Sequence, residues 1–427
     1  MARSHHFRRR PPAEPIDAPI PSGIDNSLGR FAALDIPAFR NYFIATTVPN
    51  TGSWMQIVAQ GWLVLSLTDS PFYLGLVGLV RAVPTILLSL IGGVLADHFD
   101  RRRILIVTQS VAMISSILLA VLVIADVVTV WHILTISFIS SIFFAADNPT
   151  RQALVPDLVG KERLTSAIGL NAAAWNGAAV IGPSIAGILI AVVGVSGAFA
   201  VNAVSYLAVM GVVITMPELP RYASTKRSVA GQLADGMRYI GGQRAIWGIL
   251  LLIAIPSLGA RPYIQMMPVF ARDILGLGAT GYGVLMAASG IGALIGALAV
   301  TSLGASTRRG TILLAVTAGL GLTLIAFSSS HWLLPSLALV VVVGGASTLM
   351  MSLANAVLQG LVPGEMRGRV MSVYSLIAAG FMPLGSMLLG SLGSLIGVPL
   401  AVGLGGAITI ATAALSARLL TDIRSVR

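Results

Sequence analysis

The sequence predicts an all-α membrane protein with twelve transmembrane helices arranged as two six-helix halves. Three observations predict this fold class. The 427 residues are 56% hydrophobic and only 10% charged, with a mean hydropathy of +0.89, whereas soluble domains carry about 25% charged residues. The chain contains twelve apolar runs of membrane-spanning length. A short motif also recurs at matching places in the two halves.

Each apolar run approaches the ~20 residues that a helix needs to cross a bilayer. The runs lie at about 42–67, 72–95, 104–126, 130–148, 167–193, 197–216, 245–271, 281–303, 311–328, 332–357, 369–394 and 398–419. Transmembrane β-strands would instead be ~10 residues long and would alternate in polarity. Runs such as Ile104–Leu122 do not alternate, so helices are expected.

The distribution of positive charge predicts the orientation of the helices. On the map above, 24 of the 27 lysines and arginines fall on one side, together with both termini. Arg272 alone lies on the other side, and Arg81 and Arg261 lie inside their helices. Because cytoplasmic loops carry the excess of positive charge, we expect a multi-pass protein of the cytoplasmic membrane with both termini inside. Topology thus explains the net charge of +11, and no nucleic-acid partner is expected.

Composition divides the chain into five segments. Residues 1–40 are polar and rich in Pro and Arg, without the apolar stretch of a signal peptide, and are predicted to form a mobile cytoplasmic tail. The first bundle is expected at 41–216, a cytoplasmic linker at 217–244, the second bundle at 245–420 and a cytoplasmic C-terminus at 421–427. Helical spacing of apolar residues in the linker fits a helix on the membrane surface, and an unstructured tether is the alternative.

The internal repeat indicates how the halves are related. Gln152–Pro156 reads QALVP, and Gln359–Pro363 reads QGLVP at an offset of 207 residues. Two parallel repeats imply a pseudo-two-fold axis along the membrane normal and a cavity between the halves. That arrangement is typical of secondary transporters, although shared ancestry alone would also preserve the repeat.

Charged residues cluster at the predicted connection between the second and third helices, Gly92–Arg103. There Asp97 precedes three consecutive arginines, Arg101–Arg103. A carboxylate in this place can face the positive end of a neighbouring helix and pair with arginine in one conformation only. Asp147, at the predicted end of the fourth helix, is expected to pair with Arg101 or Arg102. A permanent ion pair is the alternative to this gating role.

Several of these motifs resemble the major facilitator superfamily. Gly93–Asp97 with Arg101 and Arg102 resembles its loop signature between helices two and three, with Asp100 at a place usually held by glycine. Gly177–Gly187, centred on Gly182 and Pro183, resembles the helix-five signature of its antiporters. Asp147–Pro156 and Pro268–Gly283 resemble the exporter branch that handles siderophores and macrolides.

The resemblance implies a major facilitator fold, with two pseudo-symmetric six-helix bundles around a central cavity. It also implies secondary active export of a small amphipathic molecule, siderophore or drug-like, by alternating access coupled to protons. The residues expected to act in gating are Gly93, Asp97, Arg101, Arg102, Asp147, Arg151, Gly182, Pro183 and Arg367. Import, movement of lipid or lysolipid on the same fold, and a non-transporting sensor are the alternatives.

Two helices carry residues that favour close packing or bending. The glycines of Gly177–Gly187 allow helices to approach closely, and Pro183 removes one backbone hydrogen bond. The resemblance implies that this segment seals the resting pathway, and ordinary tight packing is the alternative. The seventh helix contains Pro256, Pro262 and Pro268 and is expected to be broken, which a membrane tolerates only beside protein or water.

Arg81 and Arg261 are the most informative polar residues inside the membrane. A charge at the bilayer centre costs at least ~2.5 kcal/mol, and no carboxylate is expected at the same depth. The two arginines therefore favour an anionic or acceptor-rich substrate. Bonds to backbone carbonyls or snorkelling are the alternatives. The predicted substrate cavity comprises Asn50, Gln56, Gln60, Arg81, Asn176, Arg261, Tyr263, Gln265, Asn355 and Tyr374.

The sequence lacks the residues that other functional classes require. The chain has no cysteine, which excludes disulfides and thiolate metal sites. We find no intramembrane nucleophile–base cluster and no glycine-rich ATP-binding loop with lysine. We therefore expect no enzyme activity, no cofactor and no metal, and a protein that acts as a monomer. With no carboxylate expected in mid-membrane, Asp147 is the candidate proton carrier.

Overall fold

The computed structural model describes residues 29, 31–160, 162–216, 236–302 and 308–419, and the regular secondary structure within these ranges is helical. The helices are η1 (Ala32–Asp35), α1 (Pro37–Thr68), α2 (Pro71–His98), α3 (Arg101–Ile124), α4 (Val130–Val159), α5 (Leu164–Val193), α6 (Val195–Thr215), α8 (Arg244–Gly259), α9 (Tyr263–Val269), η2 (Phe270–Ile274), α10 (Gly278–Ser302), α11 (Arg309–Ser328), α12 (Leu333–Leu361), α13 (Gly364–Ile396) and α14 (Val398–Leu419).

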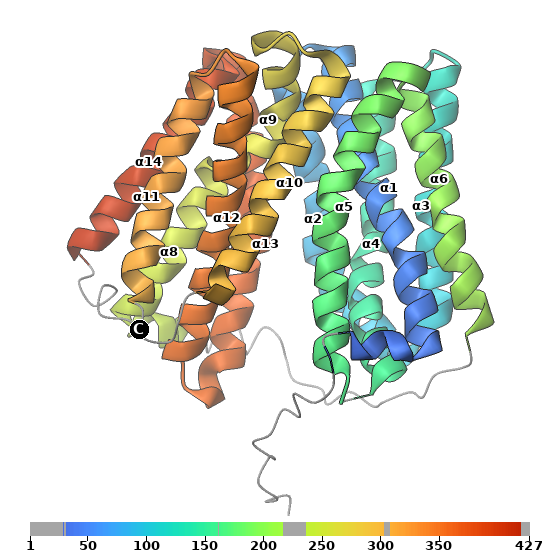
Figure 1. The fold of residues 1–427 in the computed structure, drawn as a ribbon, viewed down its shortest axis with the longest axis horizontal. Helices are drawn as coiled ribbons and strands as arrows, with labels where there is room; N and C mark the ends of the chain where they lie inside the picture. The colour runs from blue at the N-terminus through green and yellow to red at the C-terminus, as the bar shows by residue number, and fades with distance from the viewer. Residues whose placement is uncertain (1–28, 30, 161, 217–235, 303–307, 420–427) are drawn as a thin grey trace, which may run out of the picture.

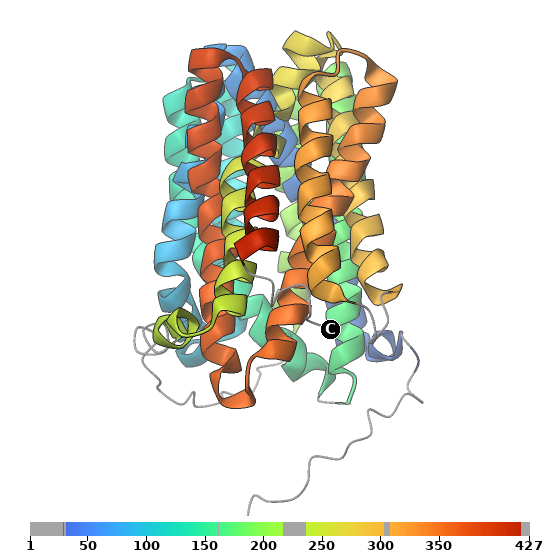
Figure 2. The ribbon, with the colours of Figure 1, turned by 90° about the vertical axis from the view of Figure 1, so that its left-hand side faces the viewer.

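These helices form two bundles that stand side by side (Figure 1). One contains α1 to α6 and the other contains α8 to α14. The view from the side in Figure 2 shows that the long helices run roughly parallel to one another along the height of the molecule. The described residues form twelve spans when α8, α9 and η2 count as one, so the predicted all-α class is confirmed.

Eleven spans of the described residues are long and apolar enough to cross a membrane by composition alone, and α1 is the exception. Its 32 residues include polar side chains such as Asn50, Gln56 and Gln60 on a helix of otherwise sufficient length. Gln60 is buried and Gln56 half-buried. Polar residues in a membrane helix are expected to face protein or water rather than lipid, and α1 packs against α4, α5 and α6.

The seventh span is broken, as its prolines predict. Helix α8 ends at Gly259, α9 covers only Tyr263–Val269, and a π-helical turn, η2, follows. Pro262 occupies the N-cap of α9, where its missing N–H leaves no helical hydrogen bond unmade. This span is also the one most enclosed by protein among the eleven, which agrees with the rule that broken helices avoid lipid.

Helix α4 is longer than predicted at its C-terminal end, and this changes the interpretation of Asp147. Helix α4 runs to Val159 rather than to residue 148, because Pro149 and Pro156 lie inside the helix instead of ending it. Helix α12 likewise runs to Leu361. Asp147 therefore lies inside α4, twelve residues before its last residue, and not at the helix end as predicted.

The predicted N-terminal tail also needs correction at its end. Residues 32–40 were assigned to a mobile tail, but η1 and the start of α1 pack on the first bundle. The side chains of Ala32 and Ala33 are buried, and the Ala33 N–H donates to Ser166 Oγ of α5 at 3.2 Å. Residues 1–28 of the predicted tail, residues 217–235 of the predicted linker and the whole predicted C-terminus, 421–427, lie outside the described residues.

We name the two ends of the molecule by their charges. The basic face carries the ends of helices at Arg40, Arg101–Arg103, Arg163, Arg244, Arg309 and Arg367, and the opposite face carries Asp69 and Arg272. In Figure 1 the basic face is at the bottom and the opposite face at the top.

Candidate functional site

The two bundles meet along α5 and α10 at unusually short backbone distances. A Cβ atom at Gly283 would lie 2.5 Å from the Pro183 carbonyl oxygen, and one at Gly290 would lie 2.7 Å from the Ala179 carbonyl oxygen. The Thr280 hydroxyl of α10 donates to the Gly187 carbonyl oxygen at 3.3 Å. All of these contacts lie in the half of α5 and α10 nearer the opposite face. Small residues here allow the backbones of the two bundles to touch.

A second close contact between the bundles joins α2 to α13 at the same level. We call this contact and the one between α5 and α10 the two glycine seams. A Cβ atom at Gly75 would lie 2.3 Å from the Ser386 carbonyl oxygen, and one at Gly390 would lie 2.6 Å from the Pro71 carbonyl oxygen. The Phe72 N–H donates to Ser394 Oγ at 3.0 Å. Helix α2 begins and α13 ends at the opposite face, so this seam also closes the half of the molecule nearer that face.

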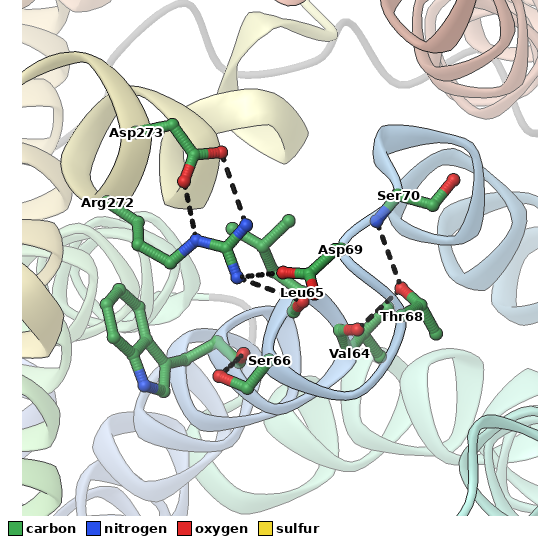
Figure 3. Close-up of polar contacts among 9 residues, drawn as sticks. Val64, Leu65, Ser66, Thr68, Asp69, Ser70, Arg272 and Asp273 are labelled. Atoms are coloured by element: carbon green, nitrogen blue, oxygen red, sulfur yellow. Dashed lines mark hydrogen bonds and ion pairs between the residues drawn. The ribbon is translucent and has the colours of Figure 1, made fainter.

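An ion pair closes the opposite face itself (Figure 3). Arg272 of η2 donates from Nη1 to Asp69 Oδ1 at 2.7 Å and to the Leu65 carbonyl oxygen at 3.2 Å, both at the end of α1. Its Nε also donates to Asp273 Oδ1 at 2.6 Å. Since Arg272 belongs to the second bundle and Asp69 to the first, we call this contact the cross-bundle ion pair.

The basic-face half shows a different arrangement. Among the described residues, no hydrogen bond or ion pair joins the two bundles there. Asp97, near the end of α2, and Arg367, in the first turn of α13, form no side-chain hydrogen bond or ion pair within the described part of the chain. The two bundles are therefore in close contact toward the opposite face, and no described hydrogen bond or ion pair joins them toward the basic face.

The ion pairs near the basic face lie within the first bundle, and the predicted partners need correction. Asp147 was expected to pair with Arg101 or Arg102. Arg101 instead pairs with Asp157 of α4, and Arg102 donates to the Val213 and Ile214 carbonyl oxygens at 3.2 and 2.8 Å. The reason is the extension of α4, which moves Asp147 deep into the bundle and brings Asp157 to the level of Arg101.

Asp147 is fully engaged by neighbours in its own bundle. Its Oδ1 accepts from Thr108 Oγ1 at 2.6 Å and from Gln109 Nε2 at 2.8 Å, and its Oδ2 accepts from Arg151 Nε at 2.6 Å. The side chain is 6% exposed. A buried carboxylate with an arginine one helical turn away and two further donors satisfies the rule that buried charges are paired and hydrogen-bonded.

The predicted connection around Gly93 also differs in detail. Gly93 lies inside α2 with open space around it, whereas Gly92 makes the close contact, since a Cβ there would lie 2.2 Å from the Ala145 carbonyl oxygen of α4. The turn is confined to Phe99 and Asp100. Asp100 takes the place usually held by glycine because it caps α3: its Oδ1 accepts from the Arg102 N–H at 2.9 Å.

The two central residues of the predicted helix-five signature face different partners. A Cβ at Gly182 would lie 2.7 Å from the Thr51 carbonyl oxygen, so Gly182 brings α5 against α1 within the first bundle. The Pro183 carbonyl oxygen meets Gly283 of the second bundle. The signature thus lies at the point where the closed half of the molecule begins.

The predicted cavity residues of the first bundle separate into two groups. Gln60 donates to Ser137 Oγ at 2.6 Å, and Gln56 accepts from Ser116 Oγ at 2.8 Å and from the Asn202 amide. These bonds hold α1 against α3, α4 and α6. Asn50 and Asn176 are half-buried, and the Asn176 amide bonds back to the Ala172 carbonyl of its own helix. Gln56 therefore serves internal packing, whereas Gln60 also lines a small pocket at the bundle interface.

That pocket contains Arg81 and Gln265, one from each bundle. Its lining comes from α1, α2 and α9 and comprises Ile57, Gln60, Gly61, Val64, Leu74, Val77, Gly78, Arg81 and Gln265. The structure thus brings three of the predicted cavity residues together at one place between the bundles. The enclosed space suits a water-sized group rather than a whole substrate molecule.

The predicted cavity residues of the second bundle are held mostly by protein. Arg261 donates to Ser257 Oγ and to the Ala378 carbonyl oxygen, both at 3.4 Å. Tyr263 is buried and shares a 2.7 Å hydrogen bond with Ser289. Tyr374 donates to the Met351 carbonyl oxygen at 3.1 Å, and half-buried Asn355 accepts from Gln359.

Sequence reasoning missed the cross-bundle ion pair. The signal was present, because Arg272 is the single basic residue predicted on its side of the membrane, and Asp69 closes the first apolar run. An arginine that violates the charge distribution needs a local reason. The contact itself depends on how the two bundles meet, which no pattern within a single helix shows.

The fold and the interface together define the class of this protein as a major facilitator-type transporter. Solved structures of that class share the fold: a bacterial homologue of the lysosomal transporter Spinster aligns at a TM-score of 0.69 with 16% identity, over 91% of this chain and 96% of that one. A D-xylose–proton symporter aligns at a TM-score of 0.70 with 13% identity, over 90% of this chain and 98% of that one.

The chain belongs to the transmembrane secretion effector family of this superfamily, whose model matches residues 28–425. The multidrug efflux pump Tap of Mycolicibacterium fortuitum is 29% identical over 83% of this chain and 88% of its own length. The enterobactin exporter EntS of Escherichia coli O1:K1 is 25% identical over 84% and 86%.

The staphyloferrin A transporter of Staphylococcus aureus is 26% identical over 60% of this chain, and the match spans 65% of that relative's length. The family and these relatives are membrane transporters of small molecules rather than enzymes.

Proposed function

We propose that this protein exports a small amphipathic molecule, siderophore or drug-like, across the cytoplasmic membrane by proton-coupled alternating access. The observation that carries the proposal is the asymmetry of the bundle interface. Every close backbone approach and polar bond between bundles described above lies toward the opposite face. The export direction is supported by relatives named as efflux pumps and exporters.

With the basic face in the cytoplasm, the described state is closed to the outside. The cross-bundle ion pair and the two glycine seams then form the outer closure. Alternating access requires that these contacts break when the inner half closes, and that other contacts replace them.

Asp97 and Arg367 are the residues we assign to the inner closure. Helices α2 and α13 are already neighbours at the opposite face, so rotation of the bundles about that seam brings the end of α2 toward the start of α13. Both side chains are free of other ion pairs in the described structure. A carboxylate at the N-terminal end of α13 is favoured by the helix dipole and by Arg367.

We assign proton coupling to Asp147. It is the one carboxylate among the described residues that lies well inside a transmembrane helix, and Arg151 stands beside it. An ionised carboxylate held by three donors can accept a proton only when those donors rearrange. All three donors belong to the first bundle, so we assign this rearrangement to a local change within that bundle that accompanies the movement of the two bundles.

The test uses inverted membrane vesicles, in which a cytoplasmic basic face points outward. An acidic interior is imposed, and accumulation of a catecholate siderophore, a macrolide and ethidium is measured. Wild-type protein is expected to concentrate at least one of them, and Asp147→Asn to lose gradient-driven accumulation while it retains substrate exchange without a gradient. Accumulation only in right-side-out vesicles would show an importer, and equal accumulation by Asp147→Asn would remove Asp147 from the coupling.

A further inference from the structure

Three arginines of the described residues lie inside transmembrane spans away from the ends of those spans: Arg81 in α2, Arg151 in α4 and Arg261 in the turn between α8 and α9. Arg151 pairs with Asp147, and Arg261 donates to Ser257 and to the Ala378 carbonyl. Arg81, near the middle of α2, makes no hydrogen bond or ion pair through its guanidinium within the described part of the chain. The sequence gives no reason to distinguish Arg81 from Arg261. In the structure, described protein groups accept hydrogen bonds from the guanidinium of Arg261 and not from that of Arg81.

The Arg81 side chain lies at the interface between the two bundles. It is exposed, yet it lines the same pocket as Gln265 of α9, which belongs to the other bundle. A guanidinium in the middle of a membrane helix costs at least ~2.5 kcal/mol unless water, protein or a ligand solvates it. Since protein supplies no such bond here, the group is available to water or to a bound molecule.

The rest of the pocket is suited to an amphipathic anion. Gln265 is half-buried and its side-chain amide makes no hydrogen bond with the described residues, so it can donate beside Arg81. The lining also includes the apolar side chains of Ile57, Val64, Leu74 and Val77. A fixed cation with an adjacent amide recognises an acidic oxygen through charge-assisted hydrogen bonds, and the apolar side chains accept the carbon atoms that carry it.

No protein carboxylate competes for this cation among the described residues. Asp147 is the one acid well inside a span, and Thr108, Gln109 and Arg151 occupy it. The others lie at helix ends or in connections: Asp35, Asp69, Asp97, Asp100, Asp126, Asp157, Glu162, Asp273 and Glu365. The interface near Arg81 therefore has a positive charge that the described protein does not neutralise.

We infer that the cargo carries an acidic oxygen, as a carboxylate or a similar anionic group, and that Arg81 with Gln265 holds it at the bundle interface. This inference rests on the proposed transport function and names its substrate class. Because the two residues come from different bundles, a ligand that bridges them is sensitive to the distance between the bundles. The small pocket accepts the acidic head group, and the apolar side chains that line it contact the carbon atoms next to that group.

The experiment compares matched pairs of probes on the purified full-length protein in lipid nanodiscs. Benzoate with benzamide, 2-naphthoate with 2-naphthamide, and 1-pyrenecarboxylate with its amide differ in charge at nearly constant shape. Ligand-dependent stabilisation against thermal unfolding gives the affinity of each probe. Wild-type protein is expected to bind at least one carboxylate about tenfold more tightly than its amide, since a charge-assisted hydrogen bond contributes about 1.5 kcal/mol or more.

Two variants locate the preference. Arg81→Gln is expected to bind both members of a pair equally, and Arg81→Lys to keep part of the preference. Arg261→Gln is the matched control, because that guanidinium already bonds to protein, and it is expected to keep the wild-type preference. Absence of any preference in wild-type protein, its survival in Arg81→Gln, or its equal loss in Arg261→Gln would overturn the inference.

The experiments distinguish failure of the proposed transport function from failure of the proposed anion site. Gradient-driven accumulation of cargo with no charge preference would contradict the anion site and leave transport in place. Binding of carboxylates through Arg81 without accumulation of any cargo in vesicles would leave the site in place and contradict the transport function.

Discussion

Two arginine–aspartate pairs of similar geometry occupy very different positions in this molecule. The cross-bundle ion pair, Arg272–Asp69, has an N–O distance of 2.7 Å, and its two side chains are 28% and 79% exposed. The Arg151–Asp147 pair measures 2.6 Å, with exposures of 21% and 6%. One pair joins the bundles, and the other lies within a single helix of the first bundle. Geometry alone therefore does not say what an ion pair does.

The comparison separates stability from conformational preference. A contact within one bundle persists when the bundles move as rigid bodies, so it does not by itself favour one of these states over another. A contact between bundles exists only in the closed arrangement of one face, so it shifts the balance between states. The exposed position of the cross-bundle ion pair keeps it weak, which suits a contact that must break in each transport cycle.

The largest effect is expected from breaking the internal pair. Asp147→Ala leaves the half-buried Arg151 without its carboxylate and the buried Thr108 and Gln109 without their acceptor, and removal of one partner of a buried pair costs about 3 kcal/mol or more. Chemical unfolding of the purified protein in detergent micelles measures this cost. Asp273→Ala is the control, because that carboxylate is 41% exposed and its loss is expected to cost under about 1 kcal/mol. Equal losses of stability in Asp147→Ala and Asp273→Ala would contradict the distinction between the buried pair and the exposed pair.

An intermediate effect is expected at the glycine seam between α5 and α10. In Gly283→Ala the new methyl group meets the Pro183 carbonyl oxygen of the other bundle, so the closed outer half is destabilised by about 2 kcal/mol and the outward-open state gains population. Double electron–electron resonance between labels on the two bundles reports this shift. The chain has no cysteine, so introduced labelling sites are unique.

Gly292→Ala is the matched control for the seam. Its methyl group would lie 1.9 Å from the Val341 carbonyl oxygen of α12, a contact within the second bundle. We expect it to lower thermal stability and to leave the distance distribution unchanged. The account of the seam would be wrong if both glycine variants produced the same shift between states.

The smallest effect is expected from the cross-bundle ion pair. Asp69 has a left-handed backbone conformation with φ of 47°, which asparagine tolerates well, so Asp69→Asn removes the charge without backbone strain. Loss of the pair is expected to change the ratio of the two states by about fivefold, equivalent to about 1 kcal/mol, and less at high salt. Asp273→Asn removes the partner of Arg272 within the second bundle and is expected to change the ratio less. A larger change in the ratio of states for Asp273→Asn than for Asp69→Asn would contradict the role of the cross-bundle ion pair.

Much of this architecture is predictable from sequence, and what is missed has a physical cause. Apolar runs and charge distribution predict the twelve spans, because each depends on one helix and its lipid surroundings. The end of α4 was misplaced because Pro149 and Pro156 indicate a helix end by local rules, whereas packing in the bundle keeps them helical. That single error displaced Asp147 and assigned it to Arg101 and Arg102.

The candidate site was predictable as a set of residues and not as an arrangement. Polar residues inside apolar runs identify Arg81, Gln60 and Gln265, which the structure brings together. The same rule also selects Gln56, whose amide bonds to Ser116 and Asn202 within the bundle. Sequence cannot distinguish a polar residue that faces a neighbouring helix from one that faces the bundle interface, because both avoid lipid for the same reason.

The most direct test of the central claim measures both faces of wild-type protein at once. Spin labels at Val127 and Ser329 report the opposite face, and labels at Arg103 and Leu361 report the basic face, with distances recorded in nanodiscs across a pH range and with added cargo. Rocking bundles predict that one distance shortens whenever the other lengthens. Two distances that stay fixed, or that lengthen together, would contradict the account.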